Sequence, residues 1–130
     1  MKKRTINVTI TKEETGYSAF TNIGHDFIGT QGDSYEELKA NILEAVNLAF
    51  EDMGIVYSIE EVRFTLDLPS FFEFYKILNA KALSHRIGMN QSLLAQYISG
   101  KKKPSPTQTQ RILKGVQQIG KELSEIRFIM

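Results

Sequence analysis

The sequence contains no cysteine and no tryptophan, only three prolines, and no long apolar run. Without cysteine, disulfides, thiolate zinc sites and cysteine nucleophiles are excluded. No apolar stretch reaches the roughly 20 residues that a membrane-spanning helix needs. The basic residues 1–4 are followed by polar, alternating sequence, so we expect no secretory signal. A cytoplasmic location is the expectation that agrees with these absences.

What is present is an ordinary globular composition with an uneven distribution of charge. The 130 residues are 42% hydrophobic and 24% charged, which excludes wholesale disorder and collagen-like sequence. Residues 1–70 carry six basic and twelve acidic side chains, a net charge of −6. Residues 71–130 carry ten basic and three acidic side chains, a net charge of +7. Such opposition indicates two surfaces with different partners, the basic one being a candidate for nucleic acid, unless the charges only solvate two faces.

Alternating apolar and polar residues predict β-strands in the first half of the chain. The strands are expected over residues 5–11, 17–23, 26–30 and 61–68. Thr15-Gly16 fits a hairpin connection, and residues 31–33 a turn before the next element. In the last strand, alternate apolar residues are expected to face inward, namely Val62, Phe64, Leu66 and Leu68.

A capping box predicts the one helix of this half. The Ser34 side chain and the Glu37 carboxylate can each accept a hydrogen bond from a backbone amide at the helix start. Gly54 is expected to end this helix. Its apolar stripe consists of Leu38, Ile42, Ala45, Val46, Ala49 and Met53. The first half therefore reads β-β-β-α-β, with the helix covering one face of a sheet.

After residue 68 the pattern becomes helical, so we predict an α+β protein with domains at 1–69 and 70–130. Pro69-Ser70, with Glu73, fits a second capping box. Five aromatic residues lie between positions 64 and 75, and a run of this kind usually belongs to a core or a domain interface.

Two short helices are predicted in the second half, joined by a three-residue turn. Asn79 can cap a helix over 80–87, and Asn90 can cap another from 91 to about 98. Gly88 and Gly100 can end these helices in the left-handed region. This is a helix-turn-helix pattern, whose second helix can enter a major groove. The candidate DNA-binding residues on this helix are Asn90, Gln91, Ser92, Ala95 and Gln96.

A run of three lysines follows the second helix. Lys101, Lys102 and Lys103 could reach phosphates, which would make the affinity for DNA depend on salt. Ser105 and Pro106 then fit the start of a closing helix. The apolar stripe of that helix is expected at Ile112, Val116, Ile119 and Leu123, with Arg111 and Lys114 adding positive charge. The alternative is a small helical bundle with a polar surface and no DNA.

Two families are similar to parts of this chain. Residues 83–101, with Ser84 four positions before Gly88 and the pair Gln91-Ser92 opening the second helix, resemble the helix-turn-helix of phage-repressor-type regulators. Residues 29–38, Gly-Thr-Gln-Gly-Asp-Ser-Tyr-Glu-Glu-Leu, resemble the HicB antitoxin family. The two similarities together cover about residues 1–70 and 79–123.

The resemblance implies a partial ribonuclease-H-like half that neutralises a small HicA-like ribonuclease toxin, and a half that represses the operon. It also implies a homodimer or higher oligomer on an inverted-repeat operator. Residues 20–26 depart from the aromatic-Pro-Asp-Leu-Pro-Gly stretch usual in the family, so the contact with a toxin could differ. The candidate toxin-binding residues are Tyr17, Phe20, Phe27 and Asp33. The alternatives are a transcription factor whose first half senses another partner or ligand, and an interaction module without DNA.

Enzyme, metal and cofactor functions are not expected. An active ribonuclease H needs several carboxylates converging on paired metal ions, and Asp26, Asp33 and Asp67 near strand ends are more typical of turns. His25 and His85 are far apart in the sequence and lack metal-ligand spacing. The glycines do not form a phosphate-binding loop.

Overall fold

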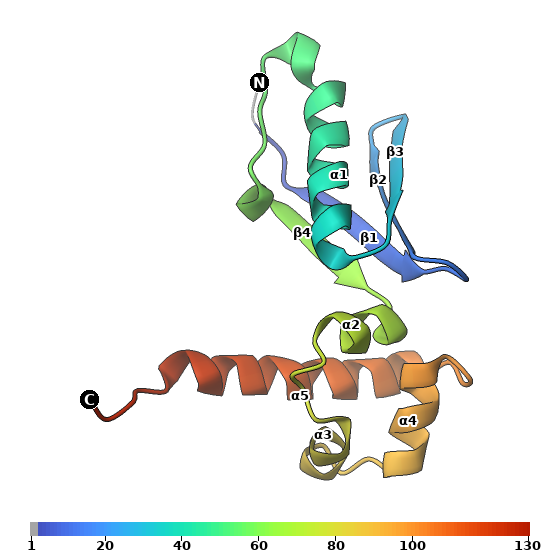
Figure 1. The fold of residues 1–130 in the computed structure, drawn as a ribbon, viewed down its shortest axis with the longest axis vertical. Helices are drawn as coiled ribbons and strands as arrows, with labels where there is room; N and C mark the ends of the chain where they lie inside the picture. Colours follow the sequence, from blue (N-terminus) through green and yellow to red (C-terminus); the bar gives the residue numbers. More distant parts are fainter. Residues whose placement is uncertain (1–2) are drawn as a thin grey trace. The chain divides into compact units, whose positions relative to one another are not determined.

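The structure, a computed structural model, describes residues 3–130 and is α+β, with a four-stranded mixed sheet and five α-helices in the described chain (Figure 1). It divides into two compact units, one ending at Phe74 and the other beginning at Tyr75. No helix in the part of the chain that is described has the length and apolar character to cross a membrane.

The first unit is a sheet with a helix on one face. The sheet contains the strands β1 (Ile6–Lys12), β2 (Tyr17–Ile23), β3 (Asp26–Gly32) and β4 (Val62–Leu66). Their order is β3-β2-β1-β4; β2 is antiparallel to both of its neighbours, and β4 is parallel to β1. The helix α1 (Tyr35–Ala49) connects the two edge strands, β3 and β4, and packs across the sheet. The predicted β-β-β-α-β order is confirmed.

The hairpin between β1 and β2 requires glycine at its end. Gly16 has φ 72°, and its carbonyl accepts a hydrogen bond of 3.1 Å from the Glu13 amide. A Cβ at Gly16 would lie 2.8 Å from the Gly32 carbonyl oxygen, so a side chain there would meet both backbone strain and a clash. The predicted connection at Thr15-Gly16 is confirmed. The predicted turn at 31–33 is wrong in part, because β3 continues to Gly32, which pairs with Tyr17.

The core of the first unit joins the inner face of the sheet to α1. Alternation places every second residue of β1 against the helix, and the helix presents residues spaced by three or four. Burial of each large aliphatic side chain contributes roughly 1.5–3 kcal/mol. The core residues from these elements are Ile6, Val8, Ile10, Ala19, Ile28, Leu38, Ile42, Val46 and Val62.

The start of α1 agrees with the sequence, but its end does not. The Ser34 hydroxyl accepts from the Glu37 amide at 3.1 Å, and the Glu37 carboxylate accepts from the Asp33 amide at 3.3 Å. The helix ends at Ala49, with Phe50 as its C-cap. Gly54, φ 67°, ends the following short 3-10 helix, so the prediction that it ends α1 was wrong. Where the chain leaves α1, the Phe50 ring packs against Tyr57, with ring centroids 5.4 Å apart.

The transition from strand to helix after β4 also differs from the prediction. The strand ends at Leu66, and α2 (Leu68–Phe74) begins two residues later. The Asp67 carboxylate accepts from the Ser70 amide at 2.9 Å, so Asp67 caps α2 in place of the predicted Ser70. Ser70 is fully buried inside α2, and its hydroxyl has no hydrogen-bond partner among residues 3–130. Pro69 is tolerated because the amides of the first turn need no partner within the helix.

Helix α2 belongs to the first unit, so the compact units meet at 74/75 and not at the predicted 69/70. The Phe74 ring stacks on Tyr35, with centroids 4.7 Å apart, and lies 4.6 Å from Tyr17. The Glu73 carboxylate accepts from the Lys12 ammonium at 2.6 Å. Burial, together with the hydrogen bond to Glu73 and the nearby carboxylates, raises the pKa of Tyr17 to about 12. These contacts attach the aromatic run to the sheet, and the predicted core role of that run is confirmed for Phe72 and Phe74.

The second unit consists of three helices whose starts match the sequence closely. They are α3 (Ala80–Arg86), α4 (Gln91–Ser99) and α5 (Pro106–Glu125). The side chains of Asn79, Asn90 and Ser105 each accept from a backbone amide in the first turn of the helix that follows. Pro106 occupies the first position of α5, where its missing N–H costs nothing. The predicted starts of these three helices are confirmed, and the predicted ends of α3 and α4 differ from the observed ones by one residue.

Two glycines inside α5 are expected to respond oppositely to alanine substitution. A Cβ at Gly115 would lie 2.4 Å from Ile87 Cγ2, whereas a Cβ at Gly120 has nothing within 4 Å. Gly120→Ala should stabilise the unit by about 0.5–1 kcal/mol, because glycine is the poorer helix former. Gly115→Ala should lose this gain and destabilise by about 1–3 kcal/mol through overpacking. Urea unfolding of the two variants measures the difference, and equal stabilities would contradict it.

Candidate nucleic-acid interface

The turn between α3 and α4 is held by its own backbone and by one side chain from α5. Gly88 has φ 67°, and the Met89 amide donates to the Ser84 carbonyl at 2.8 Å. From α5, the Arg111 guanidinium donates to the Ile87 carbonyl at 3.0 Å and to the Gly88 carbonyl at 2.7 Å. Arg111 therefore satisfies carbonyls that the end of α3 leaves open. From its sequence Arg111 is expected only to add positive charge, and no local pattern indicates this structural role.

A small apolar core fixes the position of α4. Leu94 and Ile112 are each 1% exposed, and they anchor α4 and α5. Residues predicted to share this core are inside or half-buried, namely Leu83, Ile87, Leu94, Ile98, Ile112, Val116 and Ile119. Leu123 is 61% exposed, so its predicted place in the buried stripe was wrong. At this end of α5 the neighbouring Glu122, and not Leu123, reaches α3, where it pairs with Arg86.

The opposite side of α4 is polar and open to solvent. Gln91, Ser92, Ala95 and Gln96 are all exposed, as the helical spacing predicted. Asn90 is exposed too, but its side-chain oxygen accepts from the Ser92 and Leu93 amides at 2.8 and 3.2 Å. Asn90 thus acts as the helix cap, and its amide nitrogen is the part left for another partner. The exposed face of α4 carries amide and hydroxyl groups with no charge.

The three lysines lie at the other end of α4, in the connection to α5. Lys101, Lys102 and Lys103 are exposed, and within residues 3–130 none of them makes a salt bridge. The Lys102 amide donates to the Gln96 carbonyl at 3.2 Å, which ties the run to the end of α4. Gly100, with φ 81° in the left-handed region, lets the chain turn back toward the end of α4. The lysines are therefore attached to the helix whose polar face is exposed.

The difference in net charge between the two units is larger than the difference between residues 1–70 and 71–130. Up to residue 74 the chain has six basic and thirteen acidic residues, a net charge of −7; from 75 on it has ten and two, a net charge of +8. One cation of the second unit, Arg86, is paired with Glu122. The hydrogen bond with Arg86 lowers the pKa of Glu122 below its usual value. Both side chains are nearly half exposed, so solvent screens the attraction between them. The ion pair therefore contributes little to the stability of the unit.

The residues proposed for a protein partner lie in the first unit and only some of them are accessible. Phe27 is 66% exposed, and its ring stacks on the half-buried Phe20 with centroids 5.9 Å apart. Asp33 is exposed beside the start of α1. Tyr17 is 6% exposed and packs against Phe74, so the expectation that it offers an exposed apolar contact was wrong. The strand alternation turns Tyr17 inward because β2 buries every second residue.

Among the described residues, no group of three or more histidine, cysteine, aspartate or glutamate side chains is placed to hold a metal ion. Both histidines, His25 and His85, are exposed and lie in different units. Asp67, one of the three aspartates near strand ends, is used by the α2 cap and by the Lys12 amide at 3.1 Å.

Comparisons with known proteins identify no relative for this chain. No protein-family model, no curated protein and no solved structure matches it.

Proposed function

We propose that this protein binds operator DNA through α4 and represses its own operon, while its first unit neutralises an RNA-cleaving toxin. The observation that carries the DNA-binding part is the exposed polar face of α4 directly beside three unpaired lysines, in a unit of net charge +8. Amide and hydroxyl side chains can form hydrogen bonds with base edges, and lysines can form ion pairs with phosphates. Both kinds of contact would be made from one rigid segment.

The interpretation of α3 and α4 as a helix-turn-helix rests on their lengths and their connection. Two helices of seven and nine residues are joined by a turn that contains a left-handed glycine. In this motif the second helix enters the major groove, and residues near its N-terminus contact base edges. Gln91 and Ser92 occupy that end of α4, and Gln96 lies further along the same exposed side.

We propose that two copies bind one operator, because a single short recognition helix contacts only a few base pairs. The end of α5 and the residues after it offer a surface for the second copy. Leu123 is 61% exposed, Ile126 is 51% exposed and Phe128 is 85% exposed. Lys121 and Glu125 lie on the same stretch, so its charges can pair with those of an antiparallel copy. An inverted-repeat operator, with half-sites about one helical turn apart, follows from this symmetry.

Gln91→Ala tests the assignment of base contacts to α4. A bidentate contact between glutamine and adenine contributes about 1–3 kcal/mol to discrimination, so the variant should bind the operator about 10- to 100-fold more weakly. Its affinity for random DNA should stay the same. Gln117→Ala, at an exposed glutamine of α5, is the matched control. Fluorescence titration measures both affinities and gives two chains per operator; equal losses on operator and random DNA would exclude Gln91 from base reading.

The antitoxin part of the proposal rests on the first unit. Its strand and helix order, β-β-β-α-β, agrees with the partial ribonuclease-H-like half that the HicB resemblance implies. Its net charge of −7 complements the basic surface of a protein that binds RNA. Phe27, exposed and stacked on Phe20, supplies an apolar centre for such a contact. Blocking the RNA-binding face of a toxin requires no catalysis by this chain.

The second candidate function is a transcription regulator whose first unit binds another partner or a ligand. A cavity in the first unit favours this candidate and is described in the next subsection. The gene beside the one that encodes this chain distinguishes the two functions. A small basic ribonuclease encoded there would support the antitoxin, and a metabolic enzyme or transporter would support the ligand-controlled regulator.

A further inference from the structure

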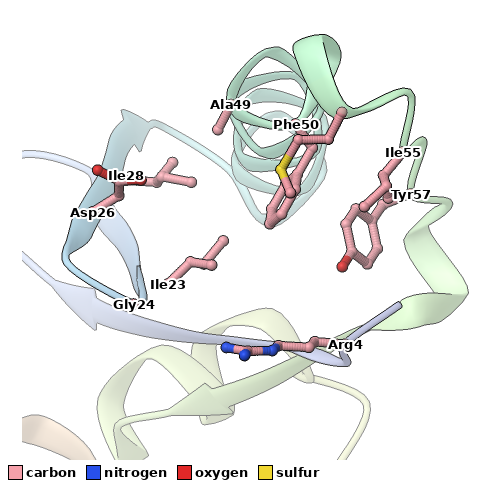
Figure 2. Close-up of a pocket in the computed structure, with 10 residues that line it drawn as sticks. Arg4, Ile23, Gly24, Asp26, Ile28, Ala49, Phe50, Ile55 and Tyr57 are labelled. Carbon is pink, nitrogen blue, oxygen red and sulfur yellow. The ribbon is translucent and has the colours of Figure 1, made fainter. Parts of the chain in front are cut away.

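A cavity of about 240 Å³ opens at one end of the sheet in the first unit (Figure 2). It lies where β2 ends and β3 begins, beside the C-terminal end of α1 and the loop that follows. Most of its lining is apolar and comes from Ile23, Ile28, Ala49, Phe50, Met53, Ile55 and Tyr57. Since a water molecule occupies about 30 Å³, the space suits a molecule of roughly eight to ten non-hydrogen atoms. This is smaller than a nucleotide or a typical drug.

One polar group of a mostly buried residue faces this cavity and has no partner in the described chain. Tyr57 is 3% exposed, and within residues 3–130 its hydroxyl makes no hydrogen bond. Its backbone is held on both sides by Asn47, which accepts from the Tyr57 amide at 2.7 Å and donates to its carbonyl at 3.1 Å. Figure 2 shows the hydroxyl directed toward the lower edge of the cavity. Among residues 3–130 the Ser70 hydroxyl is the only fully buried side-chain polar group without a partner, so the Tyr57 hydroxyl keeps access to the cavity. It is therefore free to donate a hydrogen bond to a ligand there.

A cation lies at the same edge of the cavity. Arg4 lines it, and in Figure 2 its side chain runs along the edge toward which the Tyr57 hydroxyl points. Arg4 makes no salt bridge in the described chain, whereas its neighbour Lys3 is paired with Glu61 at 2.8 Å. A guanidinium binds a carboxylate through two parallel hydrogen bonds, and the tyrosine hydroxyl can donate a third. The apolar part of the ligand would then occupy the space between Phe50 and Ile23.

We propose that this cavity binds a small apolar carboxylate, with Arg4 and Tyr57 holding the carboxylate and the apolar walls holding its tail. Asp26 also lines the cavity and adds a negative charge, and the negative end of the α1 dipole is beside Ala49 and Phe50. An α-ammonium group on the ligand would complement both features. The ligand class is therefore apolar carboxylates, which include α-amino acids such as leucine. This inference is independent of the proposals on DNA and on a toxin.

Calorimetric titration of the full chain with leucine and with 4-methylpentanoate, its analogue without the ammonium, tests the proposal. At least one of the two should bind, and 3-methylbutylamine, which lacks the carboxylate, should not. Stronger binding of leucine would assign the site to amino acids, and stronger binding of 4-methylpentanoate would assign it to plain carboxylates. Absence of binding by both compounds at millimolar concentration would overturn the proposal.

Three variants show whether the binding uses this cavity. Arg4→Gln should weaken the carboxylate at least about 10-fold, since it removes a charge-assisted contact. Tyr57→Phe keeps the ring and removes the hydroxyl, so the protein should stay folded while affinity falls a few-fold. Arg63→Gln, at an exposed arginine of β4 that does not line the cavity, is the matched control and should bind normally. Equal affinities of Arg4→Gln and Arg63→Gln would place any binding elsewhere and overturn the proposal.

Discussion

Replacing Lys101, Lys102 and Lys103 together by alanine is expected to weaken binding to operator and random DNA alike. Each lysine that contacts a phosphate releases a counterion and contributes about 0.9 to the slope of log affinity against log salt. The triple variant should therefore flatten this slope by up to about 3. In low salt the loss of affinity should reach about 100-fold or more, because three contacts are removed at once. Titrations at several salt concentrations measure both quantities.

The control for this variant removes the same amount of charge from the same unit. Lys76, Lys81 and Lys114 are exposed cations that lie outside the connection between α4 and α5 and outside the proposed surface for the second copy. Their triple alanine variant lowers the net charge of the unit equally but should leave the salt slope nearly unchanged. If both triple variants flatten the slope to the same extent, the effect is one of net charge, and the lysine run contacts no phosphate.

A fragment ending at Phe74 is expected to protect cells against the toxin as well as the full chain does. The fragment keeps α2, whose Glu73 and Phe74 pack on Lys12, Tyr17 and Tyr35, so the first unit retains its own contacts. It also keeps the whole acidic surface. Growth after co-expression with the proposed toxin, a ribonuclease that would be encoded beside this chain, measures protection. The full chain carrying Gln91→Ala should protect equally, since this substitution changes only the proposed DNA contact.

Two further measurements make this result interpretable. Circular dichroism must show a cooperative thermal transition for the fragment, which separates failure to fold from failure to bind. Phe27→Ser, at a side chain 66% exposed, should leave folding intact and lower protection at least about 10-fold, because it removes an apolar anchor. A folded fragment that neither binds the ribonuclease nor protects would place the neutralising surface elsewhere or remove the antitoxin function.

Local signals were read correctly where one side chain acts on its own neighbours. Ser34, Asn79, Asn90 and Ser105 each cap the helix that the sequence assigned to them. A capping contact spans only two or three residues, so the sequence contains both partners. For the same reason the exposed side of α4 follows from helical spacing alone, and with it the candidate DNA-binding face.

The errors arose where a distant contact decided between two local choices. Both Asp67 and Ser70 could cap α2, and burial of Ser70 left the cap to Asp67. Gly54 fits a helix end, but α1 ends earlier at Ala49, and its C-cap Phe50 packs against Tyr57. Leu123 has the right spacing for the core of the second unit, but it is 61% exposed, and its neighbour Glu122 is the residue that reaches α3. Local patterns give spacing and do not say where the neighbouring element stops.

The sequence by itself therefore determined the α+β class, the order of strands and α1 in the first unit, the starts of α1, α3, α4 and α5, and the polar face of α4. Only the tertiary structure decided that β4 pairs in parallel with β1, that α2 belongs to the first unit, and that Tyr17 is buried. The cavity between Arg4 and Tyr57 is of the same kind, because its walls come from segments far apart in the chain. Local structure depends on residues a few positions apart, whereas sheet order, burial and cavities depend on which distant surfaces pack together.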